Sequence, residues 1–282
     1  MGYSTLIDTG TLAGKLNAPA WVVIDCRFNL SDTGAGERAY FEAHIPGARY
    51  AHLDRDLSSP ITADSGRHPL PDVSALAKRL GEWGIDRHSQ VVAYDDSGGA
   101  MAVRLWWLLR WLGHEGVAVL DGGWQKWCRE GREITASMPQ VQAKAFIPHP
   151  DDGKWLSTPQ IQAAMAAGDI LLLDARTAER FRGEHEPIDP VAGHVPGAAN
   201  FPLQQNLAAD GSFLTAEELH VLYERQLQGR DAAEVVHMCG SGVTAAHNLL
   251  AMEHAGLHGS RLYAGSWSEW IRDPQHPVAT ST

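Results

Sequence analysis

Short apolar runs alternate along the chain with longer segments in which apolar residues recur every three or four positions. The short runs suit strands that are buried on both faces, and the longer segments have the period of amphipathic helices. This alternation predicts an α/β fold with mainly parallel sheets flanked by helices. We expect helices over residues 71–83, 100–112, 215–226 and 243–255.

Local signals support three of these helices. Thr215 and Glu218 form a capping-box pattern at the start of the third helix, and Gly256 follows the end of the fourth. The second helix is so rich in large apolar side chains that it must be largely buried, as shown by Trp106, Trp107, Leu109 and Trp111.

The pattern of strands and helices occurs twice. Residues 21–27 (WVVIDCR) resemble residues 170–176 (ILLLDAR), and three further blocks recur in the same order: HIPGA and HVPGA, QVVAYDDSGG and EVVHMCGSGV, LDGGWQKW and LYAGSWSEW. Four ordered matches indicate two copies of one unit. We predict a first domain over 1–135, a linker over 136–157 that is rich in Pro, Gly and Asp, and a second domain over 158–282.

Composition narrows the range of partners. The chain has 282 residues, 44% of them hydrophobic, which is enough for two cores. Its net charge of -11 would repel phosphate, which argues against a nucleic acid or an anionic membrane as partner. The first residues lack a signal-peptide pattern and no apolar run is long enough to span a bilayer, so we expect a cytoplasmic protein.

Three cysteines at wide spacing fit neither a disulfide framework nor a CxxC metal site. Cys239 differs from the other two because it lies between an apolar run and the glycine-rich turn that opens the fourth predicted helix. Such a turn points backbone N–H groups inward, and the helix adds its positive end. These donors favour a thiolate over a thiol, so Cys239 is the predicted nucleophile. We expect Cys26 and Cys128 to be packing residues.

The first copy of the repeat provides an internal comparison. Asp95 occupies the position equivalent to Cys239, so the first domain keeps the turn without the nucleophile and should be catalytically silent. A cysteine-dependent phosphatase would need an arginine six residues after the nucleophile, where this chain has Ala245. The phosphatase interpretation is therefore set aside.

From Asp25 through the HIPGA blocks to the loop 239–245 and Trp270, the chain resembles the rhodanese superfamily in its two-domain form. The resemblance implies a silent N-terminal domain and a C-terminal domain whose cysteine carries sulfur as a persulfide, with the active site at their interface. The loop is similar to that of 3-mercaptopyruvate sulfurtransferases. Thiosulfate sulfurtransferases typically carry charged residues where this chain has Gly240 and Ser241.

The resemblance also implies roles for individual residues. Arg180 would bind the carboxylate or sulfonate end of the donor, and the backbone of the loop would bind the transferred sulfur through Gly240, Gly242, Val243 and Thr244. Arg176 recurs as Arg27 in the silent copy and is expected to be structural, whereas Arg182 is left open. Asp189 stands about where a second carboxylate-binding arginine is usual, which weakens the expected binding of a carboxylate donor.

Mercaptopyruvate enzymes also use a serine, a histidine and an aspartate to polarise the donor, and this resemblance points to Ser241, His68 and Asp54. His44 and His194 recur in both copies and are expected to be structural. The resemblance implies a small-molecule sulfur donor and no metal or organic cofactor. The implied acceptor is either cyanide or a thiol, such as that of thioredoxin. The sequence thus favours transfer of sulfur from 3-mercaptopyruvate, with thiosulfate:cyanide transfer and a non-catalytic sulfur carrier or regulatory module as alternatives.

Overall fold

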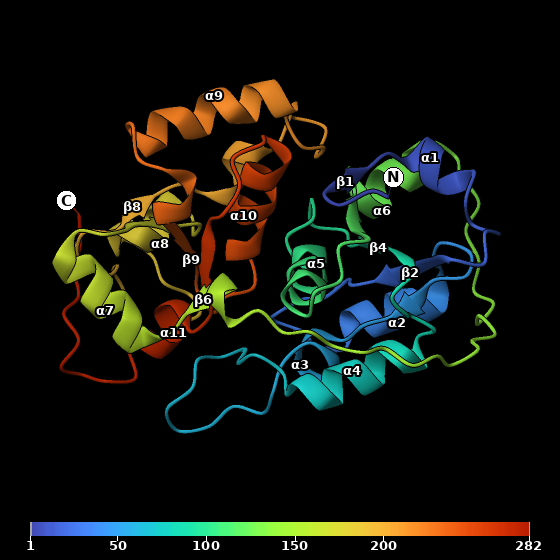
Figure 1. Ribbon diagram of the computed structural model, residues 1–282, viewed down its shortest axis with the longest axis horizontal. Helices are drawn as coiled ribbons and strands as arrows, with labels where there is room; N and C mark the ends of the chain where they lie inside the picture. The colour runs from blue at the N-terminus through green and yellow to red at the C-terminus, as the bar shows by residue number, and fades with distance from the viewer. Residues whose placement is uncertain (1, 282) are drawn as a thin grey trace. The chain divides into compact units, whose positions relative to one another are not determined.

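The computed structural model describes residues 2–281, which form two compact units. Unit 1 comprises residues 2–59, 71–151 and 208–213. Unit 2 comprises residues 60–70, 152–207 and 214–281. Segment 60–70 thus packs with the second unit although it lies within the first half of the sequence (Figure 1).

Each unit contains a five-stranded parallel sheet in the part of the chain described. In unit 1 the order is β1-β5-β4-β2-β3, built from β1 (Leu6–Ile7), β2 (Trp21–Asp25), β3 (Arg49–Tyr50), β4 (Gln90–Tyr94) and β5 (Val117–Leu120). In unit 2 the order is β6-β10-β9-β7-β8, built from β6 (Trp155–Leu156), β7 (Leu171–Asp174), β8 (Ala199–Asn200), β9 (Val235–Met238) and β10 (Arg261–Tyr263). The two orders are the same, so the duplication seen in the sequence is a duplication of the fold.

Helices flank both sheets, as the sequence predicts. Unit 1 contains α1 (Thr9–Ala13), α2 (Ala35–Glu42), α3 (Leu53–Asp56), α4 (Val73–Glu82), α5 (Ala102–Trp111) and α6 (Gly123–Arg129). Unit 2 contains α7 (Thr158–Ala167), α8 (Ala178–Arg182), α9 (Ala216–Leu227), α10 (Ala245–His254) and α11 (Ser266–Trp270), with short 3-10 turns η1 (Asp152–Lys154), η2 (Leu203–Asn206) and η3 (Ala232–Glu234). The four predicted helices correspond to α4, α5, α9 and α10, with ends shifted by one or two residues.

The predicted signals act locally as expected. Thr215 and Glu218 form the capping box of α9, and the four crowded side chains of α5 are buried. The edge strands β1 and β6 were not anticipated, and β6 lies within the stretch 136–157 that we predicted to be the linker. Two residues are too few to show a period in the sequence.

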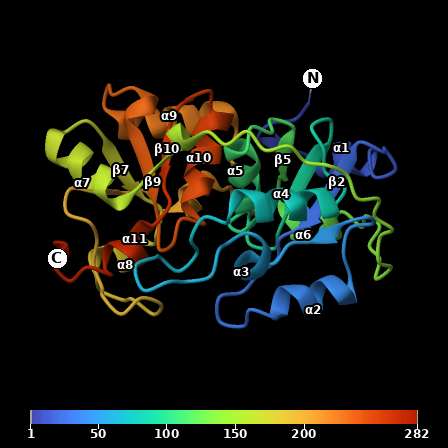
Figure 2. The same cartoon turned by 60° about the horizontal axis from the view of Figure 1, so that its bottom comes forward.

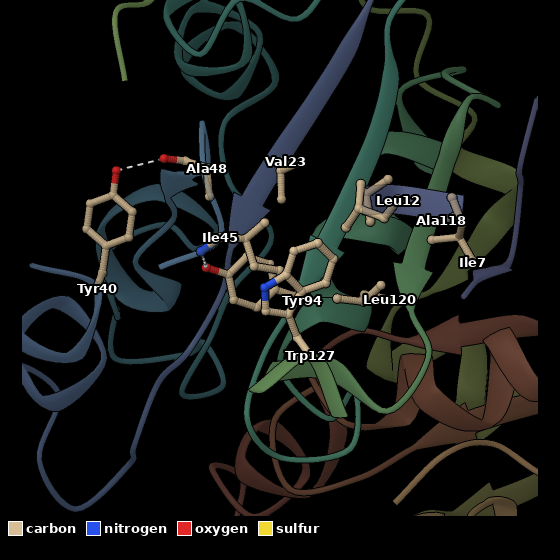
Figure 3. Close-up of a cluster of buried hydrophobic side chains, with 11 residues drawn as sticks. Ile7, Leu12, Val23, Tyr40, Ile45, Ala48, Tyr94, Ala118, Leu120 and Trp127 are labelled. Atoms are coloured by element: carbon tan, nitrogen blue, oxygen red, sulfur yellow. Dashed lines mark hydrogen bonds between the residues drawn. The ribbon is translucent and has the colours of Figure 1, made fainter. Parts of the chain in front are cut away.

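Alternation along the central strands divides each core into two layers. In unit 1 one face of the sheet packs Val23, Tyr94, Ala118 and Leu120 against residues of α1, α2 and α6, as Figure 3 shows. In unit 2 Val236 and Met238 of β9 belong to the cluster that includes α7 and α11. The alternate β9 residue His237 therefore points to the opposite face, where α10 packs against β9 and α9 packs against α10 (Figure 2).

Segment 60–70 is held to unit 2 by a close backbone approach. A Cβ on Gly66 would lie 2.7 Å from the carbonyl oxygen of Gly265, so only glycine fits there. The backbone N–H of Arg67 then donates to Ser268 Oγ at 2.9 Å, and Arg272 Nε donates to the Ser65 carbonyl oxygen at 3.0 Å. These contacts fix the two residues that follow Gly66 in unit 2. Across residues 2–281, no helix has the length and apolar character needed to cross a membrane.

Candidate active site

Cys239 directly follows β9 and is 1% exposed. The turn after it is held by α11, because the N–H of Trp267 donates to the Cys239 carbonyl oxygen at 3.0 Å and that of Ser268 to the Gly240 carbonyl oxygen at 2.8 Å. Gly242 has a φ of +74°, and a Cβ there would lie 2.1 Å from the carbonyl oxygen of Ala264. The sequence of the turn is therefore set by its packing against the chain that follows β10.

The equivalent turn of unit 1 holds a carboxylate. Asp95 directly follows β4 and is fully buried. One of its oxygens accepts hydrogen bonds from the backbone N–H groups of Ser97 and Gly99 at 2.8 and 2.9 Å, and the other accepts from Met101 and Ala102, both at 2.7 Å. The turn is thus an anion-binding nest in the copy that lacks the cysteine.

In unit 2 the sulfur takes the place of that carboxylate. The N–H of Ser241 points to Cys239 Sγ at 3.5 Å, and Thr244 is the residue that precedes α10, whose first residue is Ala245. Gly240, Gly242, Val243 and Thr244 form the turn, and Val243 is 3% exposed. Their binding of the transferred sulfur stays a prediction. A charge on sulfur in this position would meet the same kind of backbone donors that hold Asp95.

Ser241 and His68 lie together beside the turn. His68 Nδ1 is 2.7 Å from Ser241 Oγ, and both residues are buried. This brings together two of the three residues expected to polarise the donor. The third, Asp54, lies on α3 of unit 1, and its part in the site stays a prediction.

Arg180, on α8, lies beside the same turn. Its guanidinium pairs with Glu186 at 2.8 Å and with Asp189 at 3.1 Å. Burial alone would raise the pKa of Glu186, but hydrogen bonds from Arg180 and from the backbone outweigh it, and the pKa is lowered. Asp189 is also bound by Arg67, so its two oxygens join two guanidinium groups.

Two of the remaining arginines are buried in structural pairs, and a third lies on the surface. Arg176 forms a buried pair with Asp174 at 2.7 Å and lies 4.7 Å over the ring of Trp267. Arg27 repeats this arrangement in unit 1. Arg182 is on the surface, paired with Glu184 at 2.7 Å. The expectation that Arg176 is structural is confirmed by its burial and its duplicate.

The other candidates of the sequence are also placed. His44 and His194 are buried and their Nδ1 atoms lie 2.7 Å from the carbonyl oxygens of Tyr40 and Phe181, which is a structural role repeated in both units. Cys26 is buried, and burial raises the pKa of its thiol well above the ordinary value. The packing role expected for Cys128 is wrong, because this residue is exposed on α6.

Sequence reasoning missed Arg67. It lies in a stretch of Ser, Gly and Pro without periodicity, so nothing indicated that its side chain would reach the turn after β9. Arg67 Nη2 would lie 3.0 Å from a Cβ on Gly240, and Arg180 Nη2 would lie 3.4 Å from the same point. The two guanidinium groups therefore lie over the residue that follows Cys239.

The family model for the rhodanese-like domain matches residues 8–130 and 157–273. The chain belongs to this family. The first match contains strands β2 to β5, and the second contains β7 to β10 together with Cys239. The edge strands β1 and β6 lie just before the matched ranges.

Relatives of similar length are known. A Pseudomonas aeruginosa protein named as a 3-mercaptopyruvate sulfurtransferase is 49% identical, over 99% of each chain, and a Mycobacterium tuberculosis protein named as a thiosulfate sulfurtransferase is 40% identical, over 98% of this chain and 97% of the relative. Both names are provisional. The solved structure of a 3-mercaptopyruvate sulfurtransferase from Leishmania major superposes with a TM-score of 0.84 at 29% identity, covering 96% of this rhodanese chain and 76% of that one.

Proposed function

We propose that the protein is a sulfurtransferase that takes sulfur from 3-mercaptopyruvate onto Cys239 and passes it to a thiol or to cyanide. The Cys239 thiolate attacks the sulfur of the donor, the carbon–sulfur bond breaks, and the enolate of pyruvate leaves and takes up a proton. The resulting persulfide then gives its outer sulfur to the acceptor and the Cys239 thiolate returns. The 49% identical relative, whose provisional name carries this activity, supports the proposal.

The contact between Ser241 and His68 is the observation that favours 3-mercaptopyruvate over thiosulfate as the donor. An enolate leaving group must be polarised and protonated as it departs, whereas the sulfite that leaves thiosulfate needs no proton. A buried hydroxyl 2.7 Å from a buried imidazole is suited to supply that proton next to the nucleophile. Thiosulfate transfer is the second candidate, favoured by the name of the 40% identical relative and by Asp189.

Catalysis is assigned to the second rhodanese-like domain alone. In the first domain four backbone N–H groups already bind Asp95, and a carboxylate cannot attack sulfur as a thiolate does. We therefore assign the first domain a supporting role, with domain limits near 1–135 and 158–282.

The test compares kcat/KM for 3-mercaptopyruvate and thiosulfate, with pyruvate release measured for the first donor. We expect the ratio to exceed one by a wide margin, and mass spectrometry to locate one added sulfur atom on Cys239. Cys128→Ser is the matched control, because Cys128 is exposed and lies in the other unit. A ratio at or below one would show that thiosulfate is the preferred donor. Undiminished sulfur transfer by Cys239→Ala would favour the non-catalytic carrier.

A further inference from the structure

We propose that Arg67 and Arg180 together form the clamp for the donor's carboxylate, and that Asp189 is an internal occupant of this clamp that the donor displaces. This inference rests on the proposed function. It supplies the second guanidinium that is absent at position 189 and places it on segment 60–70 instead.

Position is the first argument. In 3-mercaptopyruvate a single carbonyl carbon separates the sulfur-bearing carbon from the carboxylate, so a carboxylate clamp must lie next to the nucleophile. Arg67 and Arg180 both reach the space above Gly240, the residue after Cys239, at 3.0 and 3.4 Å from its missing Cβ. A Cβ at position 240 would already crowd Arg67, so a larger side chain there would enter the space that the two guanidinium groups share.

The present occupant is the second argument. The carboxylate of Asp189 bridges the two guanidinium groups, with one oxygen on Arg67 and the other on Arg180. This is the arrangement that a bound carboxylate would adopt between two arginines. The Asp189 side chain is 2% exposed, while those of Arg67 and Arg180 are 24% and 16% exposed, so the cations remain accessible where the anion is not.

The charge balance and an unsatisfied hydrogen-bond donor are the third argument. Arg67 and Arg180 are balanced by Asp189 and Glu186, so an incoming carboxylate would add an uncompensated charge if Asp189 kept its place. Arg67 Nε is buried and has no hydrogen-bond acceptor among residues 2–281, which leaves it a donor to offer a ligand. A cavity of about 270 Å³ borders Arg67, Asp189, Ser268 and Arg272 and gives the displaced side chain room to move.

The experiment uses the full chain and two measurements. The first is KM for 3-mercaptopyruvate, and the second is the pyruvate concentration that half-protects Cys239 from alkylation by iodoacetamide. Removing one charged hydrogen-bond donor from the clamp should raise both quantities about 10- to 100-fold in Arg67→Ala and Arg180→Ala, with kcat within a few-fold. Arg67→Lys should give a smaller rise, because it keeps the charge but not the forked geometry.

Asp189→Asn should change the same quantities in the opposite direction, lowering each about threefold or more because the competing charge is removed. Arg182→Ala is the matched control: it removes one arginine of the same helix that points to solvent, and it should leave both quantities unchanged. Unchanged pyruvate protection in Arg67→Ala, or a rise in Asp189→Asn, would overturn the clamp. If the unchanged protein did not turn over 3-mercaptopyruvate but pyruvate still protected Cys239 through Arg67 and Arg180, the proposed function would be overturned and the clamp would be supported.

Discussion

Removal of the buried carboxylate from the silent turn should destabilise unit 1. In Asp95→Ala, four backbone N–H groups that now donate at 2.7 to 2.9 Å lose their acceptor. Hydrogen bonds to charged groups contribute about 1.5 to 3 kcal/mol each, but the buried carboxylate also loses its hydration on folding. Four such bonds, less the hydration that the carboxylate regains on unfolding, leave a net loss of about 3 to 5 kcal/mol.

The assay is urea unfolding followed by circular dichroism, together with the melting temperature. About 3 to 5 kcal/mol corresponds to a drop on the order of 10 °C for a domain of this size. Asp96→Asn is the matched control, because Asp96 is the adjacent residue, is exposed, and its side chain accepts a long bond from Ser97 Oγ at 3.3 Å that an asparagine can keep. If Asp95→Ala lost less than about 1 kcal/mol, the nest would be filled by water at no cost and the comparison between the two turns would fail.

Further predictions concern unit 2 and its repeat. Burial lowers the pKa of His237 from 6.5 to about 3. Between these two values the unfolded chain binds a proton that the folded chain does not, so the free energy of unfolding falls as the pH falls. On going from pH 7 to pH 4.5, His237→Leu should therefore lose about 2 to 3 kcal/mol less stability than the unchanged protein, measured by urea unfolding. Arg176→Ala and Arg27→Ala should each cost about 3 to 5 kcal/mol, because each leaves a buried aspartate unpaired; a surface-like cost below 1 kcal/mol in calorimetry would show that these pairs are not structural. Gly242→Ala should lower sulfur transfer at least about tenfold, because its Cβ would overlap a backbone oxygen, whereas Gly229→Ala, also at positive φ but in open space, should leave the rate unchanged.

The sequence was sufficient to locate the turn around Cys239. A buried strand, a glycine-rich turn and a helix follow one another there, and all three are local features with a readable period. The repeat added what a single sequence usually lacks, because Asp95 served as a comparison for Cys239. The structure then showed the physical basis of this comparison, because four backbone N–H groups donate hydrogen bonds to the Asp95 carboxylate.

The surroundings of the turn could not be predicted in the same way. Arg67 and His68 reach it from a segment without periodicity, held by the close approach of Gly66 to Gly265. Contacts of this kind depend on tertiary packing that leaves no period in the sequence. One signal was present, because the acidic residue at position 189 departs from the expected pattern, but only the structure joins Arg67 to Asp189.

The carboxylate in the first turn makes unit 1 the equivalent of a domain saturated with a ligand that cannot dissociate. Under the proposed function, unit 2 would reach a comparable state while the sulfur on Cys239 carries charge, so its folding equilibrium would be linked to its position in the catalytic cycle. The persulfide form should therefore resist local opening of the β9–α10 turn better than the alkylated or protonated form does. The expected outcome is a first unit whose stability does not change during turnover and a second unit whose stability follows the charge on its sulfur.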